Sequence, residues 1–227
     1  MASRPEKTAK GARDLRKVSS TRAPLLISIA CAILFLILFA WLAQGVFRGN
    51  AIEFDLRARA FVHQFATPAL TRVMRAFTFL GSVIFLWTLF VILAVGFYLR
   101  SLQRYTAWLA TAMIGEVILE FTLKLAFHRT RPETFFGPDP SGYSFPSGHA
   151  MGSVCFYGVL AGLLGARIKR RSIRILVYIA AAALILGIGL SRIYLGVHYF
   201  TDVVAGYCAA GVWVSTLLFA ARIRHRQ

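Results

Sequence analysis

The chain has 227 residues, of which 58% are hydrophobic, and its mean hydropathy of +0.65 is too high for an ordinary soluble domain. The formal net charge of +17 would suggest nucleic-acid binding in a soluble protein. Here the basic residues lie mainly in short segments between apolar runs, as in proteins that span membranes. The composition therefore predicts a single all-α, polytopic membrane domain and argues against a nucleic-acid partner.

Residues 1–22 are basic and contain few large apolar side chains, which predicts a disordered tail. The membrane domain is expected at residues 23–222, with a second short tail at 223–227. Apolar runs of about 20 residues predict six transmembrane helices, the first of them retained rather than cleaved as a signal peptide. They are residues 24–47, 77–99, 105–127, 147–166, 173–190 and 202–221.

The connection between the first two spans, residues 52–78, has a different pattern. Phe54, Phe61 and Phe65 recur at helical spacing, while Asp55 and Arg59 mostly lie elsewhere around the helix. This pattern predicts short helices in the outer membrane interface. Two interpretations remain open: a connector packed on the bundle, or a lid that controls lipid access.

An even number of spans places both ends of the chain on one side of the membrane. Seventeen of the 26 Lys and Arg residues then fall on that side, which predicts cytoplasmic termini in a cell (inner) membrane. The three cysteines, Cys31, Cys155 and Cys208, lie in different apolar runs and predict packed thiols rather than disulfides.

Three polar segments interrupt the apolar pattern, at residues 124–132, 145–149 and 191–202, and all three fall on the predicted extracytoplasmic side. The first contains Lys124 and Arg131, a point charge and a planar fork that suit phosphate oxygens. The alternative is that these are side chains reaching the membrane edge, which accounts well for Arg129. Glu120 lies one turn before Lys124 and predicts a supporting ion pair.

The second polar segment, Ser147-Gly148-His149, follows a proline and begins an apolar run, which predicts the start of a helix. Backbone N–H groups at such an end bind phosphate, and Gly148 would allow the ligand to approach closely. His149 would then act as general acid. The alternative is a serine-capped helix with an incidental histidine.

The third polar segment contains Arg192, His198 and Asp202. His198 and Asp202 are four residues apart and would share one face of a helix. The carboxylate could accept a proton from one imidazole nitrogen and leave the other as a nucleophile. Taken alone, these two residues are better explained as an ordinary interfacial His–Asp pair, because such pairs are common.

A metal site built on His149 and His198 is the main chemical rival. Several cations directed at one place would repel a divalent metal, and Asp202 alone offsets them. Phosphate suits this cluster better. We therefore expect no metal and no cofactor.

These segments resemble the three-part signature of the type 2 phosphatidic acid phosphatase superfamily, K-x6-RP, PSGH and SR-x5-H-x3-D. All three parts match, in the same order and without a departure. The resemblance implies a metal-independent lipid phosphatase in which His198, held by Asp202, attacks phosphorus and His149 relays the proton. It further implies that the phosphate oxygens are held by Lys124, Arg131, Ser147, Gly148 and Arg192.

Membrane members of this superfamily act on lipid phosphates or diphosphates. The resemblance favours undecaprenyl diphosphate as substrate, with phosphatidylglycerophosphate, phosphatidic acid or the 1-phosphate of lipid A as alternatives. Vanadium haloperoxidases share the signature, but six apolar spans argue against that soluble class. A non-catalytic lipid transporter or scaffold is the other rival. The oligomeric state is left open.

Overall fold

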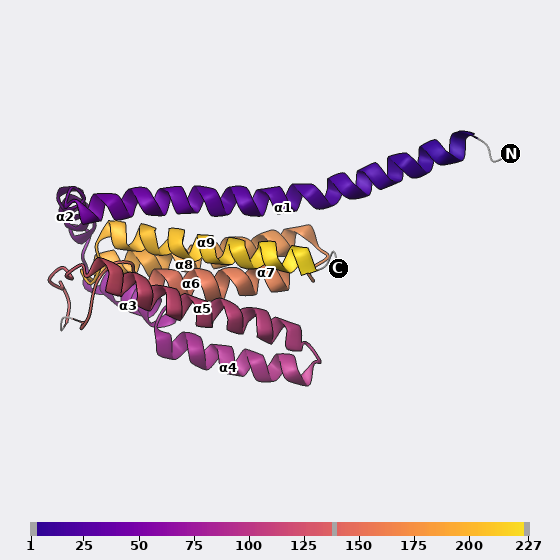
Figure 1. Cartoon of the computed structure of the whole chain (residues 1–227). Coiled ribbons are helices and arrows are strands. Elements are labelled where there is room, and N and C mark those ends of the chain that lie inside the picture. Colours follow the sequence, from indigo (N-terminus) through magenta and orange to yellow (C-terminus); the bar gives the residue numbers. More distant parts are fainter. Residues whose placement is uncertain (1–3, 138–139, 225–227) are drawn as a thin grey trace.

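The computed structural model describes residues 4–137 and 140–224, with side chains described over 25–137 and 140–221, and this part of the chain contains helices and connecting loops but no strand. Figure 1 shows a bundle whose long helices run roughly side by side, with short helices and loops gathered at one end. The elements are α1 (Arg4–Phe47), α2 (Ile52–His63), α3 (Pro68–Leu80), α4 (Val83–Leu99), α5 (Gln103–Phe127), α6 (Gly148–Ser153), the π-helical turn η1 (Val154–Gly158), α7 (Val159–Gly165), α8 (Arg171–Tyr194) and α9 (Phe200–Arg224).

Four stretches are long and apolar enough to cross a membrane within the described residues: Leu25–Phe47 of α1, Gly148–Gly165 of α6 to α7, Arg171–Tyr194, and Phe200–Ala221 of α9. The pair α3 and α4 adds a fifth if both helices count as one span bent by 52°. The helix α5, predicted as the third span, is not one of these. The structure therefore supports four or five of the six predicted spans.

The bend between α3 and α4 has a local cause. Gly81 ends α3, and Ser82 caps α4 because its hydroxyl accepts a hydrogen bond from the backbone N–H of Phe85 at 3.3 Å. The span predicted to begin at residue 77 is thus divided between two helices. The short helices predicted between the first two spans are present as α2 and α3.

The long helix α1 also differs from the sequence-based expectation. It begins at Arg4, although residues 1–22 were predicted to be disordered. This segment is rich in Ala, Lys and Arg, which are good helix formers, and it extends a helix that the apolar run has already nucleated. Residues 1–3 and 225–227 of the two predicted tails lie outside the described part of the chain.

The core lies where α6, η1 and α7 run between their neighbours. Leu109 of α5, Met151 of α6, Phe156 of η1 and Ile188 of α8 are fully buried there. The outer helix α1 packs along α9, and α3 packs along α8 (Figure 1). Cys31, Cys155 and Cys208 are free thiols, as predicted.

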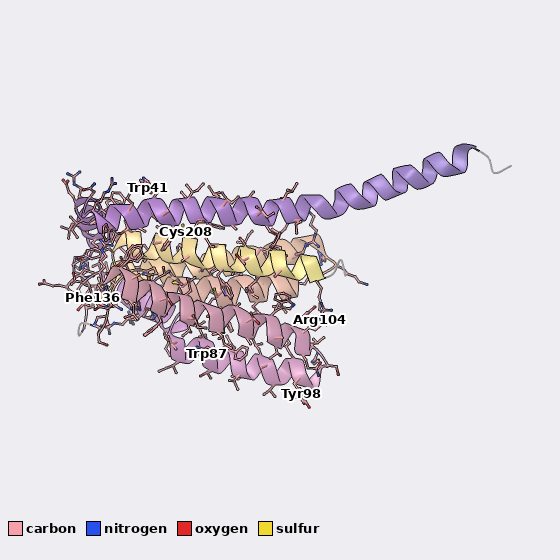
Figure 2. All side chains as sticks on the ribbon, in the orientation of Figure 1. Trp41, Trp87, Tyr98, Arg104, Phe136 and Cys208 are labelled. Atoms are coloured by element: carbon pink, nitrogen blue, oxygen red, sulfur yellow. The ribbon has the colours of Figure 1, made fainter. Side chains whose placement is uncertain are left out.

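Polar side chains gather at the end of the bundle that holds α2 and the α5–α6 loop (Figure 2). The three polar segments meet at this end, since α5 and α8 finish there and α6 and α9 begin there. Phe136 marks this end in Figure 2, whereas Tyr98 and Arg104 lie at the opposite end. The predicted convergence of the three segments is therefore present in the fold.

Candidate active site

His198 lies in the tight turn between α8 and α9, with only 2% of its surface exposed. Its Nδ1 is 3.4 Å from Oδ2 of Asp202, in the first turn of α9, and its Nε2 is 3.1 Å from Nη1 of Arg131. The sequence predicted this pair on one helix face. In the structure His198 precedes the helix, and the turn brings the two side chains together.

The partners of His198 determine its tautomer. Arginine can only donate, so Nε2 accepts a hydrogen bond from Arg131 and the ring proton lies on Nδ1, facing Asp202. Burial lowers the pKa of His198 to about 4; Asp202 opposes this shift, and Arg192 and Arg131 add to it. At neutral pH the imidazole is thus neutral, with a lone pair on Nε2.

The second polar segment begins helix α6 next to this pair. The backbone N–H of Ser147 donates to the carbonyl of Asp202 at 2.9 Å, which ties the start of α6 to the first turn of α9. The Ser147 hydroxyl is buried, has no hydrogen-bond partner among the described residues and does not cap the helix. A buried hydroxyl without a partner is costly and is well suited to bind a phosphate oxygen.

His149 lies in the first turn of α6, one residue after Gly148. It is within electrostatic reach of Arg192, His198, Lys124 and Arg131. The structure thus brings His149 to the same place as His198 and the three predicted phosphate-binding cations. This is the arrangement that a general acid beside a phosphate site requires.

Gly148 has a different neighbour from the one that the sequence suggested. A Cβ atom at this position would lie 2.0 Å from Oε1 of Glu120. The glycine therefore makes room for a carboxylate of α5, whereas close approach of a ligand was expected. The same carboxylate oxygen accepts a hydrogen bond from Lys124 at 2.5 Å, which is the predicted ion pair.

Lys124 is the predicted site residue that lies on α5, close to the end of the helix. This helix ends at Phe127, where His128 adopts a left-handed conformation (φ 46°), so Arg131 belongs to the following loop. Nε of Arg131 donates to the carbonyl of Gly142 at 3.1 Å, and Nη1 donates to the carbonyl of Val197 at 3.0 Å. These two contacts fix the guanidinium beside His198.

Arg192, near the end of α8, is 9% exposed. Its Nη1 donates to the hydroxyl of Thr78 on α3, and its Nε is buried and has no hydrogen-bond partner in the described part of the chain. Within residues 25–137 and 140–221, neither Arg192 nor Arg131 forms an ion pair with a carboxylate. Two partly or largely buried positive charges without a carboxylate partner among the described residues have the chemistry needed to bind an anion.

Three residues at this end of the bundle were not predicted to belong to the site. Arg129 was explained as a side chain at the membrane edge, yet it forms ion pairs with Asp55 at 2.7 Å and with Asp202 at 2.6 Å. Thr78 binds Arg192. Spacing offered no signal for these partners, because they lie 73 to 114 positions apart in the chain.

The PAP2 superfamily model matches residues 105–225, which include all three polar segments and more than half of the chain. The chain belongs to the PAP2 superfamily. Phosphatidylglycerophosphatase B of Bacillus subtilis is 34% identical over 183 residues, which cover 79% of this chain and 87% of that protein. A lipid A 1-phosphatase of Rhizobium etli is 35% identical over 49% of this chain and 47% of that protein.

Two solved structures extend the likeness to the fold. The crystal structure of a transmembrane PAP2-type phosphatidylglycerolphosphate phosphatase from Bacillus subtilis superposes with a TM-score of 0.73 at 30% identity. The match covers 86% of this chain and 95% of that one. Aquifex aeolicus LpxE superposes with a TM-score of 0.55 at 25% identity, covering 72% of this chain and 94% of that one. The apolar helices and this likeness make the chain a multi-pass membrane protein of the PAP2 superfamily.

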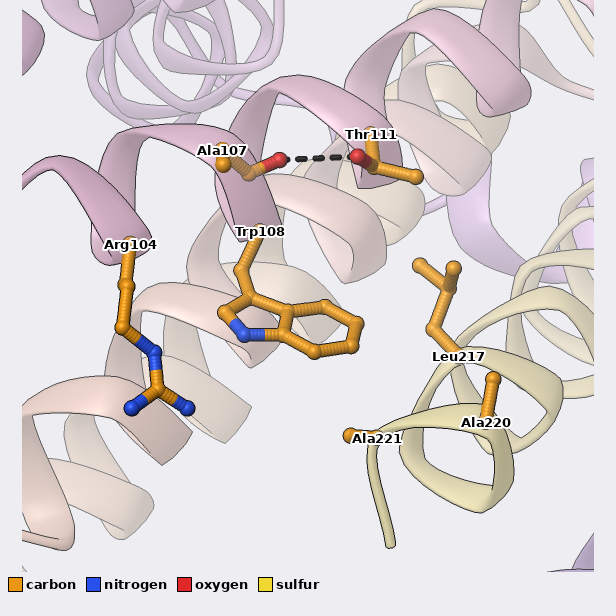
Figure 3. A pocket seen from close by; sticks show the side chains of 7 residues that line it. All are labelled: Arg104, Ala107, Trp108, Thr111, Leu217, Ala220 and Ala221. Atoms are coloured by element: carbon orange, nitrogen blue, oxygen red, sulfur yellow. Dashed lines mark hydrogen bonds between the residues drawn. The ribbon is translucent and has the colours of Figure 1, made fainter. Parts of the chain in front are cut away.

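A sizeable hollow lies far from this site, between α5 and α9 at the opposite end of the bundle (Figure 3). Its volume is about 610 Å³. The lining is formed by Arg104, Ala107, Trp108, Thr111, Leu217, Ala220 and Ala221. Arg104 is the single charged group in this lining, and the Thr111 hydroxyl is bonded to the carbonyl of Ala107 at 2.8 Å. These residues cannot supply the acid–base chemistry that the polar end of the PAP2 bundle can.

Proposed function

We propose that this chain hydrolyses the terminal phosphate of a membrane lipid through a phosphohistidine formed on His198. One observation supports this most directly: the buried, neutral imidazole has Asp202 on its Nδ1 side and Arg131 on its Nε2 side. An atom that attacks phosphorus needs a lone pair, and Nε2 carries one. That lone pair accepts a hydrogen bond from Arg131 here, and it becomes available when the guanidinium binds a phosphate oxygen instead.

In the first step, Nε2 of His198 attacks phosphorus and the bond from phosphorus to the lipid oxygen breaks. Asp202 stabilises the positive charge that develops on the imidazole, and His149 donates a proton to the departing oxygen. Charge on the three equatorial oxygens is stabilised by the surrounding donors. These are Lys124, Arg131, Arg192, the Ser147 hydroxyl and the Gly148 amide.

In the second step, water attacks phosphorus and the P–N bond breaks. His149, now without its proton, accepts a proton from that water, and inorganic phosphate leaves. His198 returns to its neutral form and His149 to its protonated form. General acid–base transfer of this kind contributes about a hundredfold to ten-thousandfold to the rate.

The substrate class is a lipid with a phosphate monoester or diphosphate. The names of the relatives support three candidates: phosphatidylglycerophosphate, lipid A 1-phosphate and, through a relative from Sulfolobus acidocaldarius that is 34% identical over 106 residues, undecaprenyl diphosphate. Undecaprenyl diphosphate is the substrate that the family resemblance favours, and it stays one of these proposals. Phosphatidic acid is the fourth candidate.

The proposed setting is a cell membrane with six spans, in which α5 and the bent pair α3 and α4 also cross the bilayer. The basic segments before Leu25 and around residues 167–174 would then face the cytoplasm. The polar end of the bundle, with His198, would face the extracytoplasmic side. Lipid phosphates of the outer leaflet would reach the site without crossing the membrane.

Purified protein should be tested for phosphate release from these four lipids in detergent or vesicles. We expect turnover of at least one lipid by the wild-type protein, and none by His198→Ala with an unchanged melting temperature. Activity should persist with excess chelator, and vanadate should inhibit it as a phosphate analogue. A strict magnesium requirement, or no release from any lipid, would overturn the proposal.

A further inference from the structure

Arg129 lies between two fully buried aspartates. Its Nη1 donates to Oδ1 of Asp202 at 2.6 Å, and its Nη2 donates to Oδ2 of Asp55 at 2.7 Å. The guanidinium also lies over the ring of Tyr199, 4.1 Å from the ring centroid. One arginine thus links the carboxylate that faces His198 to a carboxylate on helix α2.

Asp55 is held as firmly as Asp202. Its Oδ1 accepts a hydrogen bond from the backbone N–H of Thr201 at 2.9 Å, and its Oδ2 accepts one from the Thr201 hydroxyl at 2.6 Å. Oδ2 of Asp202 accepts from the backbone N–H of Tyr199 at 2.9 Å. Two carboxylates therefore bind the free N–H groups at the start of α9, where negative charge is favourable.

We propose that Asp55 and Arg129 are positioning residues for the reaction, which fix the orientation and the net charge of the carboxylate that faces His198. This inference rests on the proposed role of His198 as nucleophile. Arg129 falls at an unspecified position of the K-x6-RP part of the signature, and Asp55 lies outside both the signature and the residues that the family model matches.

The orientation follows from the contacts of Asp202. Oδ1 accepts a hydrogen bond from Arg129. Oδ2 accepts one from the backbone N–H of Tyr199 and faces the imidazole of His198. If Arg129 were absent, the carboxylate could rotate about its side-chain bonds. A misplacement of about 1 Å near a reacting group can cost about a hundredfold in rate.

The charge argument concerns the imidazolium that forms during attack. The charged or titratable groups that face His198 are Asp202 from α9, Arg131 from the α5–α6 loop, Arg192 from α8 and His149 from α6. Arg129 alone would neutralise Asp202, the single acid among them. Asp55 offsets Arg129, so that the cluster of Asp55, Arg129 and Asp202 retains one negative charge beside the imidazole.

A purely structural explanation is that this network only holds α2 on the bundle. Removing one partner of a buried ion pair would then destabilise the protein by leaving an uncompensated charge. The folded fraction, however, would keep the wild-type kcat and pH profile. Measurements on folded protein therefore separate the two explanations.

The test compares Asp55→Asn and Arg129→Gln with the wild-type protein on the same lipid substrate. We expect kcat to fall about tenfold to a hundredfold in each, while KM changes less than about threefold. Glu53→Gln is the matched control, because Glu53 lies on the same helix α2 in an exposed ion pair with Arg57. This control should keep both kcat and the pH profile.

The pH profile of kcat/KM is a second readout. The two variants should shift its acidic limb in opposite directions, which structural damage alone would not do. Asp55→Asn removes a negative charge and disfavours the imidazolium, so the acidic limb of kcat/KM should move to lower pH. Arg129→Gln removes a positive charge and should move the limb to higher pH. We expect shifts of roughly 0.3 to 1 pH unit, and the double variant should return toward the wild-type limb.

Thr201→Val provides a test that leaves every charge in place, should the other variants not fold. The Thr201 hydroxyl donates to Asp55 and accepts from Arg129 at 2.8 Å. Its loss should lower kcat about three- to tenfold without moving the pH limb. Arg129→Lys should recover part of the activity lost in Arg129→Gln.

An unchanged kcat and an unmoved pH limb in folded Asp55→Asn and Arg129→Gln would overturn this inference while leaving the proposed function intact. If those variants do not fold, an unchanged kcat in Thr201→Val would overturn it. Full activity in His198→Ala, by contrast, would overturn the proposed function itself. The two failures are therefore distinguishable in one set of assays.

Discussion

Gly148 and Glu120 fit against each other so closely that a methyl group on Gly148 would lie 2.0 Å from Oε1 of Glu120. Gly148 begins α6, and Glu120 lies on α5, where it holds Lys124 at 2.5 Å. The carboxylate of Glu120 thus occupies the space that a side chain at position 148 would need. Any larger side chain must displace the group that positions Lys124.

Gly148→Ala should therefore lower activity, by up to about a hundredfold, because Glu120 must move and Lys124 with it. Gly162→Ala is the matched control: it lies further along the same span, on α7, and nothing lies within 4 Å of its added Cβ. Lipid-phosphatase assays on both purified variants check this expectation. Equal activity in the two variants would contradict it.

Thr78→Val should weaken catalysis by removing the hydroxyl that accepts a hydrogen bond from Nη1 of Arg192. We expect kcat/KM to fall about three- to tenfold, the size of one lost hydrogen bond. Thr122→Val on α5 makes the same chemical change, but that exposed hydroxyl bonds only the carbonyl of Ile118 in its own helix. If both variants match the wild type in steady-state kinetics, Thr78 does not position Arg192.

The acidic limb of kcat/KM should lie well below pH 6.5, the ordinary pKa of histidine, because burial lowers the pKa of His198 to about 4. The imidazole is then neutral and nucleophilic above that pH and protonated below it. The phosphate of a monoester substrate itself titrates near pH 6. Measuring the pH profile with two substrates whose phosphate groups have different pKa values separates the titration of the substrate from the titration of His198.

The same shift makes stability depend on pH. Between pH 4 and 6.5 the unfolded chain binds a proton at His198 that the folded protein does not bind. The contribution of His198 to stability is thus fully present above pH 6.5 and decreases as the pH falls through this window. His198→Gln should flatten that part of the melting-temperature profile, and an equally steep profile would exclude His198 as its source.

Labelling of single cysteines should reveal the orientation in the membrane. In a background without native cysteines, Ser141→Cys in the exposed α5–α6 loop should react with an impermeant maleimide on intact cells. Gln103→Cys, at the first residue of α5, should react only after permeabilisation. The reverse pattern would place the polar end of the bundle in the cytoplasm.

The sequence was sufficient to predict the convergence of the three polar segments, because each is next to the end of a long apolar run. Lys124, Arg131, Ser147, His149, Arg192, His198 and Asp202 gather at one end of the helical bundle as a result. Local spacing also predicted the Glu120–Lys124 pair correctly, since both residues lie on one helix.

Helix α2 shows where the pattern was insufficient. Periodicity identified its apolar stripe, but Phe54 and Phe61 are exposed, whereas Asp55 and Arg59 are buried. In a membrane the apolar face can be turned toward lipid and the polar face toward the protein interior. Hydrophobic periodicity alone therefore does not indicate which face packs on the bundle.

The partners of the buried charges are the second feature that the sequence could not predict. Asp55 binds Thr201, which is 146 positions later in the chain, and Arg129 binds Asp202 across 73 positions. No local rule connects residues so far apart. The packing of α2 against α9 brings Asp55 to Thr201, and the loop that follows α5 brings Arg129 to Asp202. The bend at Gly81 likewise depends on a short cap that hydropathy does not detect.

The most direct test of the account is to trap the phosphoenzyme. Wild-type protein is mixed with a lipid carrying a radiolabelled terminal phosphate, quenched within milliseconds in alkali, and mapped by mass spectrometry. We predict a phosphate on His198 that is stable to alkali and labile to acid, that accumulates further in His149→Gln, and that is absent from His198→Ala. A phosphate on another residue, or equal labelling of His198→Ala, would contradict the mechanism.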